Sequence, residues 1–314
     1  MRILITGATG NLGTYLLRHF QGGQHQVVGW SLKTGRQLFG AAITPVDLAD
    51  PKAVEKAFDA AAPDVVIHAA AMASVEACHR APGQADAVNT TASGLLLTLS
   101  AGRRLVYVST DLVFSGEKGG YRETDVAEPL SVYGRTKRAA EPAVTSCWFA
   151  QTVAIRLGLL YGPSMTDRLN FFDRTLAALR SGQPFALFHD EWRTPLSLRS
   201  AAAAVAGVAT SNFLHFREIH HARLLHVAGP ERLSRHEMGV RIATFLVADP
   251  WRLLRASRGD AVAPEPRPRD TSLDITRWRA LFPGQTCPTL EEGLAGLGYS
   301  RLNWASGEKL PPPG

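Results

Sequence analysis

Tyr133 and Lys137 stand four residues apart, shortly after a Ser-Thr-Asp run at 109–111 that ends an apolar segment. On a helix this spacing places both side chains on one face, one turn apart. A nearby ammonium favours the charged phenolate and lowers the pKa of a tyrosine, so Tyr133 could pass a proton to a carbonyl oxygen while a hydride reaches the carbonyl carbon. Taken alone, the spacing is more typical of a surface helix pair, so the upstream residues must decide.

Three glycines, Gly7, Gly10 and Gly13, directly follow the first apolar run. Glycine lets the backbone turn tightly and approach a pyrophosphate with no Cβ in the way. The helix that begins there offers free N–H groups and the positive end of its dipole to phosphates. This position, after a strand and before an amphipathic helix, favours a dinucleotide site over a plain glycine turn. The same site is expected to include Thr9, Asn11 and Leu12.

The end of the second predicted strand bears on which dinucleotide binds. Sites for NADH commonly place an acidic residue there to hold the ribose 2′-hydroxyl. The segment VVGWSLKTGR instead carries Ser31, Lys33 and Arg36 and no carboxylate. Hydroxyl and basic groups suit a 2′-phosphate, so we predict NADPH in preference to NADH. The alternative is that Lys33 and Arg36 are solvated loop charges that contribute little.

Short β-branched runs alternate with helical segments through the first half of the chain. This alternation predicts an α/β fold, a Rossmann-type doubly wound parallel sheet with a smaller, mostly C-terminal substrate-binding lobe. We expect strands at Arg2–Thr6, Gln26–Trp30, Val65–Ala69 and Arg104–Ser109, and helices at Leu12–Phe20, Pro51–Ala61 and Ala85–Ala101.

The pattern loosens in the second half of the chain. We expect residues 1–155 to form mainly the NAD(P)-binding Rossmann domain. Residues 156–300 would complete the sheet and form the smaller lobe, with a helix capped by Ser234 and Glu237. The Pro- and Arg-rich segment 259–270 is expected to be a surface loop, and residues 301–314, which end in LPPPG, a frayed tail.

Composition limits the class of protein. The 314 residues are 45% hydrophobic and 20% charged, as in ordinary soluble globular proteins, and a net charge of +6 gives little support for nucleic-acid binding. No apolar stretch is long enough to span a membrane, and the chain leaves no room for a signal peptide before its first strand. Three separated cysteines indicate reduced thiols, so we predict a cytoplasmic protein.

No metal site is predicted. The candidate ligands are histidines without an accompanying cysteine or an H-E-x-x-H pattern, and we expect solvated or incidentally bonded imidazoles in a loop. These histidines are His215, His220, His221 and His226.

The motifs together resemble a known family. The glycine pattern, HAAA at 68–71, Asn89, YVSTDLVF at 107–114 and the Tyr133-Lys137 pair are similar to extended short-chain dehydrogenase/reductases. Within that group, STDLVF, PLSVYGRTK and the late RPRDTSLDITRWRAL most resemble the dTDP-4-dehydrorhamnose reductase family of sugar-nucleotide reductases. The resemblance extends to about Leu294. It implies an NAD(P)-dependent oxidoreductase of nucleotide-sugar metabolism that reduces a keto group on a nucleotide-linked deoxysugar.

The resemblance also implies roles for particular residues. Tyr133 would donate the proton, Lys137 would hold the nicotinamide ribose, and Thr110 would give the same carbonyl a hydrogen bond. Asp47 and Leu48 resemble the pair that contacts adenine. Further cofactor contacts would come from Ala69, Ala70, Ala71 and Asn89.

The implied substrate contacts are fewer and match the family less well. They are Val75, Glu76, Asp111 and Arg193. Arg193, in DEWRTP, could hold the substrate diphosphate bidentately, or it could form a structural ion pair with a nearby acid.

Departures from the family pattern leave alternatives open. Leu112 stands where the related 4,6-dehydratases have a glutamate, which argues against dehydration. The run at 156–159 lacks the substrate-side tryptophan of typical reductases, so another small carbonyl substrate is an alternative. A sugar-nucleotide epimerase and an NADP-binding, partner-binding protein similar to the regulatory subunit of methionine adenosyltransferase also stay open. The resemblance allows a homodimer.

Overall fold

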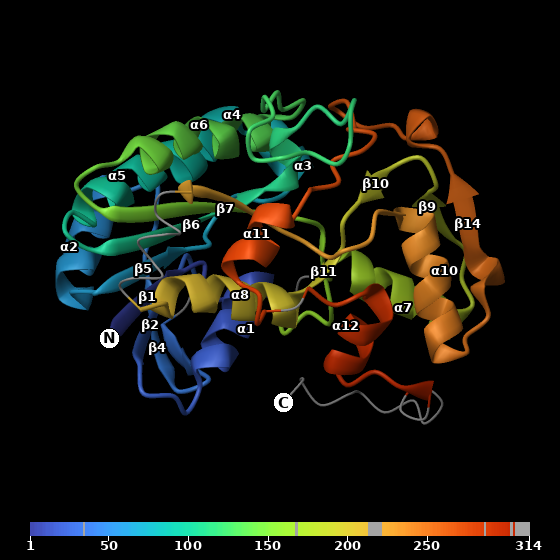
Figure 1. Ribbon diagram of the computed structural model, residues 1–314, viewed down its shortest axis with the longest axis horizontal. Coiled ribbons are helices and arrows are strands. Elements are labelled where there is room, and N and C mark those ends of the chain that lie inside the picture. The colour runs from blue at the N-terminus through green and yellow to red at the C-terminus, as the bar shows by residue number, and fades with distance from the viewer. Residues whose placement is uncertain (34, 167–168, 213–221, 286, 302–303, 305–314) are drawn as a thin grey trace.

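The computed structural model describes residues 1–33, 35–166, 169–212, 222–285, 287–301 and 304. An eight-stranded sheet crosses the larger lobe in the order β12-β7-β6-β5-β1-β2-β4-β3 (Figure 1). All neighbouring strands are parallel except β3, which runs antiparallel to β4. The strands are β1 (Arg2–Thr6), β2 (Gln26–Ser31), β3 (Arg36–Leu38), β4 (Ala41–Pro45), β5 (Val65–His68), β6 (Arg104–Thr110), β7 (Gln151–Leu157) and β12 (Leu224–Val227).

The sheet is buried on both faces, which confirms the predicted doubly wound α/β fold. Along β1, Ile3 and Ile5 pack into one hydrophobic core while Leu4, between them, packs into the other. Alternation follows from strand geometry, because successive side chains point to opposite faces. Strands covered by helices on both sides are apolar throughout, and this is why their sequences show no polar alternation.

Helices cover both faces of the sheet. On one face α1 (Asn11–Phe20) packs against α8 (Leu198–Thr210), and on the other α5 (Ala92–Leu99) lies between α2 (Pro51–Ala61) and α6 (Val132–Ser146) (Figure 1). The predicted helix Ala85–Ala101 is in fact composite. It contains the end of α4 (Pro82–Asp86), a π-helical turn η1 (Ala87–Thr91) and α5.

A smaller lobe lies beyond the carboxyl ends of the strands, at the right of Figure 1. Three two-stranded sheets pair β8 with β11, β9 with β14 and β10 with β13. The Ser234–Glu237 capping box is confirmed at the start of α10. The strands and helices of the smaller lobe are β8 (Leu160–Tyr161), α7 (Phe171–Ser181), β9 (Phe185–Phe188), β10 (Trp192–Arg193), β11 (Leu196–Ser197), β13 (Leu233–Ser234), α10 (Arg235–Leu246), η3 (Pro250–Arg252), β14 (Leu253–Ala256), η4 (Arg258–Asp260) and α12 (Leu290–Gly296). The helix α11 (Thr276–Leu281) packs against β12 at the edge of the large sheet.

One expectation about a surface residue is wrong. His226 lies fully buried in β12, where its ring contacts the carbonyl of Tyr121 at 3.0 Å and Arg156 at 3.3 Å. Segment 259–270 is largely an exposed loop, as predicted, but it carries two buried carboxylates, Glu265 and Asp270, which bind groups of the larger and smaller lobes.

Some expectations fall on residues outside those described: His215, His220, His221 and most of the 301–314 tail. Across the described ranges, none of the helices combines the length and apolar character that crossing a bilayer requires.

Candidate active site

The glycine loop between β1 and α1 has the shape of a phosphate cradle. Gly7 has a φ of +69°, and a Cβ there would lie 2.7 Å from the Cα of Ala70. A Cβ at Gly13 would lie 2.1 Å from the carbonyl oxygen of Gly7. Gly10 is the N-cap of α1 and has no side chain to occupy the first amides of the helix. This backbone leaves room for a phosphate group near the start of α1, and Gly7 and Gly13 are required on steric grounds.

The two other residues predicted in this loop face different surroundings. The Oδ1 of Asn11 accepts a hydrogen bond from Ser164 at 2.7 Å, which ties the start of α1 to the segment after β8. Leu12 is 9% exposed and belongs to the core. Asn11 and Leu12 can therefore offer a ligand chiefly their backbone amides.

Several residues predicted to contact the dinucleotide lie near the end of β2 or follow β2 and β4 in the chain. The hydroxyls of Thr9 and Ser31 lie 2.7 Å apart, and Lys33 is exposed nearby in the chain. Arg36 begins β3, and its side chain is outside the described part of the structure. Asp47 is exposed and its Oδ1 accepts from the amide of Ala49 at 2.9 Å.

Leu48 and Asn89, both predicted to contact the cofactor, have buried side chains. Leu48 packs in the core beneath the sheet edge and is 9% exposed. Asn89 is fully buried in the π-helical turn, where its Oδ1 accepts from the amide of Met72 at 2.8 Å and its Nδ2 donates to Thr136 at 3.0 Å. Asn89 thus fastens the loop after β5 to α6.

Small residues line the end of β5, as predicted. Ala69, Ala70 and Ala71 are half-buried, and the amide of Ala70 donates to the Oγ1 of Thr6 at 3.1 Å. This bond holds the loop after β5 beside the glycine cradle. Methyl side chains leave room for a flat ligand to lie across the strand ends.

Thr110 and Tyr133 are brought together by the packing of α6 on the end of β6. The Thr110 hydroxyl acts to lower the pKa of Tyr133, and it also accepts from the amide of Leu112 at 3.2 Å. Ser131 caps α6, accepting from the amide of Gly134 at 3.1 Å. A Cβ at Gly134 would lie 2.3 Å from the carbonyl oxygen of Leu112, so only glycine permits this close approach.

The ionisation of Tyr133 differs from the sequence-based expectation. Tyr133 is half-buried, and its partial removal from water raises its pKa above the usual value, which outweighs the opposing effect of the Thr110 hydroxyl. The carboxylate of Asp111 raises the same pKa further. The expected lowering required an exposed ammonium beside the phenol, whereas the charges and burial around Tyr133 act in the opposite direction.

Lys137 is buried, with 2% of its surface exposed. Its Nζ lies 4.0 Å from the centroid of the Tyr107 ring, so the ammonium rests on an aromatic face. Burial lowers the pKa of Lys137 to about 7, and the carboxylate of Glu141, one turn further along α6, acts against this. Both charge states of Lys137 are therefore accessible near neutral pH.

Arg193 forms ion pairs with two carboxylates of the protein. Its Nε lies 3.5 Å from Asp111 and a terminal nitrogen lies 3.3 Å from Glu191. Thr271 also donates to Asp111, at 2.6 Å. The guanidinium is 4% exposed, so the structure shows the ion pair that was the alternative to diphosphate binding.

The carboxylates of this cluster respond differently to their neighbours. Burial raises the pKa of Asp111 against the effect of Arg193. Burial opposes ionisation of Glu191 as well, but Arg193, Arg235 and Arg267 outweigh it and lower the pKa of Glu191 to about 2. Glu191 is therefore the negative centre of the cluster.

The remaining predicted substrate residues begin α3 (Val75–Arg80), which packs against α6. Val75 is half-buried, and Glu76 is exposed and paired with Arg80 at 3.7 Å. Glu76 is thus available to a ligand at the surface.

Sequence reasoning missed two residues that hold this site. Tyr107 lies beneath Lys137, and its only sequence signal is its place two residues before Ser109 in the same strand. Glu265, in segment 259–270, accepts from the amide of Val132 at 2.9 Å at the start of α6. No local pattern could pair residues so far apart in the chain.

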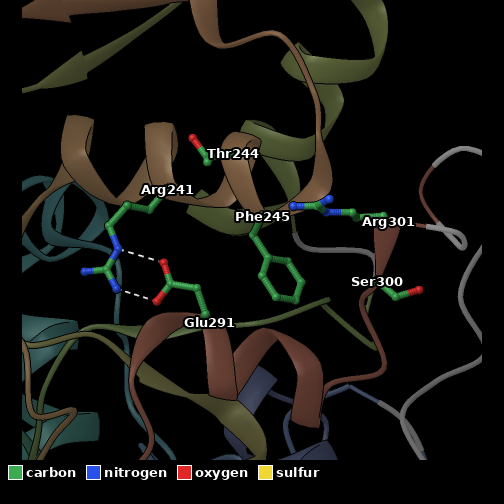
Figure 2. A pocket seen from close by; sticks show the side chains of 6 residues that line it. All are labelled: Arg241, Thr244, Phe245, Glu291, Ser300 and Arg301. Atoms are coloured by element: carbon green, nitrogen blue, oxygen red, sulfur yellow. Dashed lines mark hydrogen bonds and ion pairs between the residues drawn. The ribbon is translucent and has the colours of Figure 1, made fainter.

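A separate hollow lies between α10 and α12 (Figure 2). It is lined by Arg241, Thr244, Phe245, Glu291, Ser300 and Arg301. Arg241 crosses its wall to pair with Glu291 at 2.8 Å and with Glu231 at 2.7 Å. None of these lining residues belongs to the catalytic set, so the hollow is distinct from the candidate active site.

Comparison with known proteins agrees with this geometry. The family described as the RmlD substrate binding domain matches residues 1–297. The chain belongs to this family. It is accordingly an NAD(P)-dependent oxidoreductase of the extended short-chain dehydrogenase/reductase type, within the RmlD-like sugar-nucleotide reductases.

Individual relatives cover nearly all of the chain. The probable low-salt glycan biosynthesis reductase Agl14 of Haloferax volcanii is 30% identical, over 98% of this chain and 100% of its own. Methionine adenosyltransferase 2 subunit beta of Bos taurus is 31% identical, over 91% of this chain and 84% of its own. The solved structure of a hypothetical dTDP-4-dehydrorhamnose reductase from Sulfolobus tokodaii superposes with a TM-score of 0.77, at 29% identity, over 93% of this chain and 99% of that chain.

Proposed function

We propose that this enzyme uses NADPH to reduce a keto group on a nucleotide-linked deoxysugar, with Tyr133 as the proton donor. The observation that carries the proposal is the packing of α6 on the end of β6, which brings Tyr133 to Thr110 and places it one helical turn from Lys137. The glycine cradle lies at the same edge of the sheet, because β1 and β6 are parallel strands with one strand between them. A hydroxyl pair and a dinucleotide cradle at one edge suit carbonyl reduction.

Each catalytic side chain has a distinct role in this proposal. A bound nicotinamide would supply the hydride. Thr110 donates a hydrogen bond to the substrate carbonyl, and Tyr133 gives that oxygen its proton. The raised pKa keeps Tyr133 protonated at neutral pH, which is the state that a reductase acid requires. Lys137 holds the ribose, and its ammonium offsets the negative charge that forms on Tyr133 when the phenol gives up its proton.

The choice of NADPH rests on basic and hydroxyl groups. Ser31 ends β2 with its hydroxyl held by Thr9, and Lys33 is exposed two residues later. Arg36 follows at the start of β3. The hydroxyl and basic groups of these residues suit a 2′-phosphate, and the described part of the loop after β2 offers no carboxylate that would repel it.

The substrate class is inferred from the relatives and from Leu112. Agl14 is named as a glycan biosynthesis reductase, and the Sulfolobus tokodaii protein as a dTDP-4-dehydrorhamnose reductase. Leu112 has no acidic group with which to remove water, so reduction is favoured over dehydration. We also propose a domain boundary near residue 155, a smaller lobe that binds the substrate, a cytoplasmic location and a homodimer.

A partner-binding role is the second candidate. The similarity to methionine adenosyltransferase 2 subunit beta covers 91% of this chain, so that family member supports it directly. This role predicts NADPH binding and a stable complex with another protein, without turnover. The apposition of Thr110 and Tyr133 favours the reductase.

The deciding experiment follows NADPH oxidation with dTDP-4-keto-6-deoxy-sugar and a panel of other nucleotide-linked ketones. The expected result is turnover that depends on Tyr133. Exchange of solvent hydrogen into the sugar without net NADPH consumption would instead indicate an epimerase. Binding of NADPH with neither turnover nor exchange on any ketone would refute the reductase and favour the partner-binding role.

A further inference from the structure

A chain of buried polar side chains runs from the glycine cradle to Lys137. At the end of β1, the Oγ1 of Thr6 lies 2.7 Å from the Nδ1 of His68. The Nε2 of the same ring lies 2.9 Å from the hydroxyl of Ser93 on α5. The His68 ring also lies beside that of Tyr107, with 5.7 Å between the ring centroids, and the Tyr107 hydroxyl donates to the backbone carbonyl of Lys137 at 3.1 Å. All five residues are buried.

Tyr107 contacts Lys137 a second time, through its ring. The ammonium lies 4.0 Å from the ring centroid, within the range of a cation–π interaction. Removing an ammonium from water is costly, and the negative face of an aromatic ring restores part of the lost solvation. Tyr107 therefore fixes both ends of this lysine, the backbone through its hydroxyl and the ammonium through its ring.

We propose that Tyr107 is a positioning residue that holds the ammonium of Lys137 where the nicotinamide ribose binds, and that His68, held by Thr6 and Ser93, packs against Tyr107 and fixes it relative to the glycine cradle. The inference rests on the proposed function, in which Lys137 holds the ribose. It explains why this apolar strand carries a tyrosine at a fully buried position. It also connects the two halves of the cofactor site, the phosphate cradle and the lysine, through side chains alone.

The charged and titratable groups around Lys137 come from three strands and its own helix. Glu141 lies one turn along α6 and is paired with Arg156 of β7 at 2.6 Å. His68 of β5 stays neutral, because burial and the charge of Lys137 lower its pKa to about 3. Tyr107 of β6 stays protonated, since burial raises its pKa. Lys137 is thus the member of this set that changes charge near neutral pH.

The test measures NADPH affinity by fluorescence from about pH 6 to about pH 9, a range that brackets the Lys137 pKa of about 7. The wild type is compared with Tyr107→Phe, which keeps the ring, and Tyr107→Met, which removes it. Tyr161→Met is the matched control, because Tyr161 is equally buried and its hydroxyl also donates to a backbone carbonyl, that of Leu290. The 2′-phosphate ionises alike in every variant, so the differences between curves report on the protein.

Wild-type affinity should fall as pH rises and Lys137 loses its charge. We expect Tyr107→Phe to keep this midpoint. Tyr107→Met should move it about one pH unit lower and weaken binding at neutral pH about tenfold, because the ammonium loses the ring. If Tyr107→Met does not fold, replacing Tyr107 by pentafluorophenylalanine keeps the shape while reversing the charge of the face, and the same shift is expected.

The inference is overturned if the ring-deficient variant has the wild-type midpoint, or if Tyr161→Met shifts it equally. A shifted midpoint in a protein that reduces no ketone would leave the inference standing and refute the proposed function. Turnover of a ketone with an unshifted midpoint in Tyr107→Met would refute the inference about Tyr107 and leave the proposed function standing. A wild type that binds no NADPH would refute both.

Discussion

Arg193 and Asp111 form an ion pair, with 3.5 Å between the guanidinium Nε and the carboxylate Oδ2. This contact links β10 in the smaller lobe to the residue that follows Thr110. Thr110 in turn donates to the other carboxylate oxygen of Asp111 at 3.2 Å. Arg193 is therefore connected through Asp111 to Thr110, the threonine proposed to contact the substrate carbonyl.

Replacing Arg193 by methionine should destabilise the fold by about 3 kcal/mol, because it leaves Asp111 and Glu191 buried with one guanidinium fewer. Thermal melting measures this loss. Arg80→Met is the control: its ion pair with Glu76 is largely exposed, and the change should cost less than about 0.5 kcal/mol. An unchanged melting temperature with a raised KM for the nucleotide sugar would show that Arg193 binds substrate instead.

Tyr133→Phe removes the proposed acid, with its contact to Thr110, and keeps the ring. We expect kcat to fall by about 100-fold or more, while the Kd for NADPH changes little. Stopped-flow oxidation of NADPH and fluorescence titration measure the two quantities separately. Tyr161→Phe removes a buried hydroxyl in the smaller lobe and should retain wild-type turnover. Equal turnover in the two variants would exclude Tyr133 as the proton donor.

Lys137 should lower the stability of the folded protein, because its ammonium is buried. Its pKa of about 7 in the folded state lies below the ordinary value of 10.5, so the unfolded chain binds more protons between these pH values. Stability should therefore rise with pH across this window. Lys137→Met should stabilise the fold by on the order of 2 kcal/mol at neutral pH, flatten that rise and abolish tight NADPH binding. Urea unfolding at neutral and alkaline pH measures the stability and its pH dependence, and an NADPH titration measures binding. A Lys137→Met variant less stable than the wild type at neutral pH would contradict the prediction.

Lys33→Ala should change the choice of cofactor. The loss of one exposed cation beside a 2′-phosphate is expected to weaken NADPH binding about tenfold and to leave NADH binding unchanged. Titration with both dinucleotides gives the ratio, and Lys52→Ala on α2 controls for net charge. Equal losses for the two cofactors would mean that Lys33 does not contact the 2′-phosphate.

Glu265 caps the helix that carries Tyr133. Glu265→Ala should cost about 1 kcal/mol of stability and lower kcat, because the first turn of α6 loses its acceptor. Glu265→Gln keeps an oxygen at that amide and should restore most of both, which distinguishes a cap from a charge effect. The exposed Glu128, just before α6, provides the control substitution to alanine. If the glutamine variant is as impaired as the alanine variant, the capping role is wrong.

Local patterns accounted for most of the fold. The strand ranges of β1, β2, β5 and β6 and the helices α1 and α2 were predicted within about two residues at each end, because apolar runs and caps are encoded by neighbours in the chain. The short antiparallel β3 was missed, since its pairing with β4 is set by the sheet edge. The composite helix around Asn89 was predicted as one, because a π-helical turn leaves no mark in the apolar period.

The sequence by itself determined the phosphate cradle and the order of the catalytic motifs. Gly7 and Gly13 are needed wherever this loop precedes a helix, and Tyr133 and Lys137 share a face on any helix that contains them. Only the tertiary structure decided what surrounds these groups. The partial desolvation of Tyr133, the ring beneath Lys137 and the ion pair of Arg193 with Asp111 come from segments far apart in the chain. Desolvation and ion pairing depend on distances in space rather than on sequence spacing.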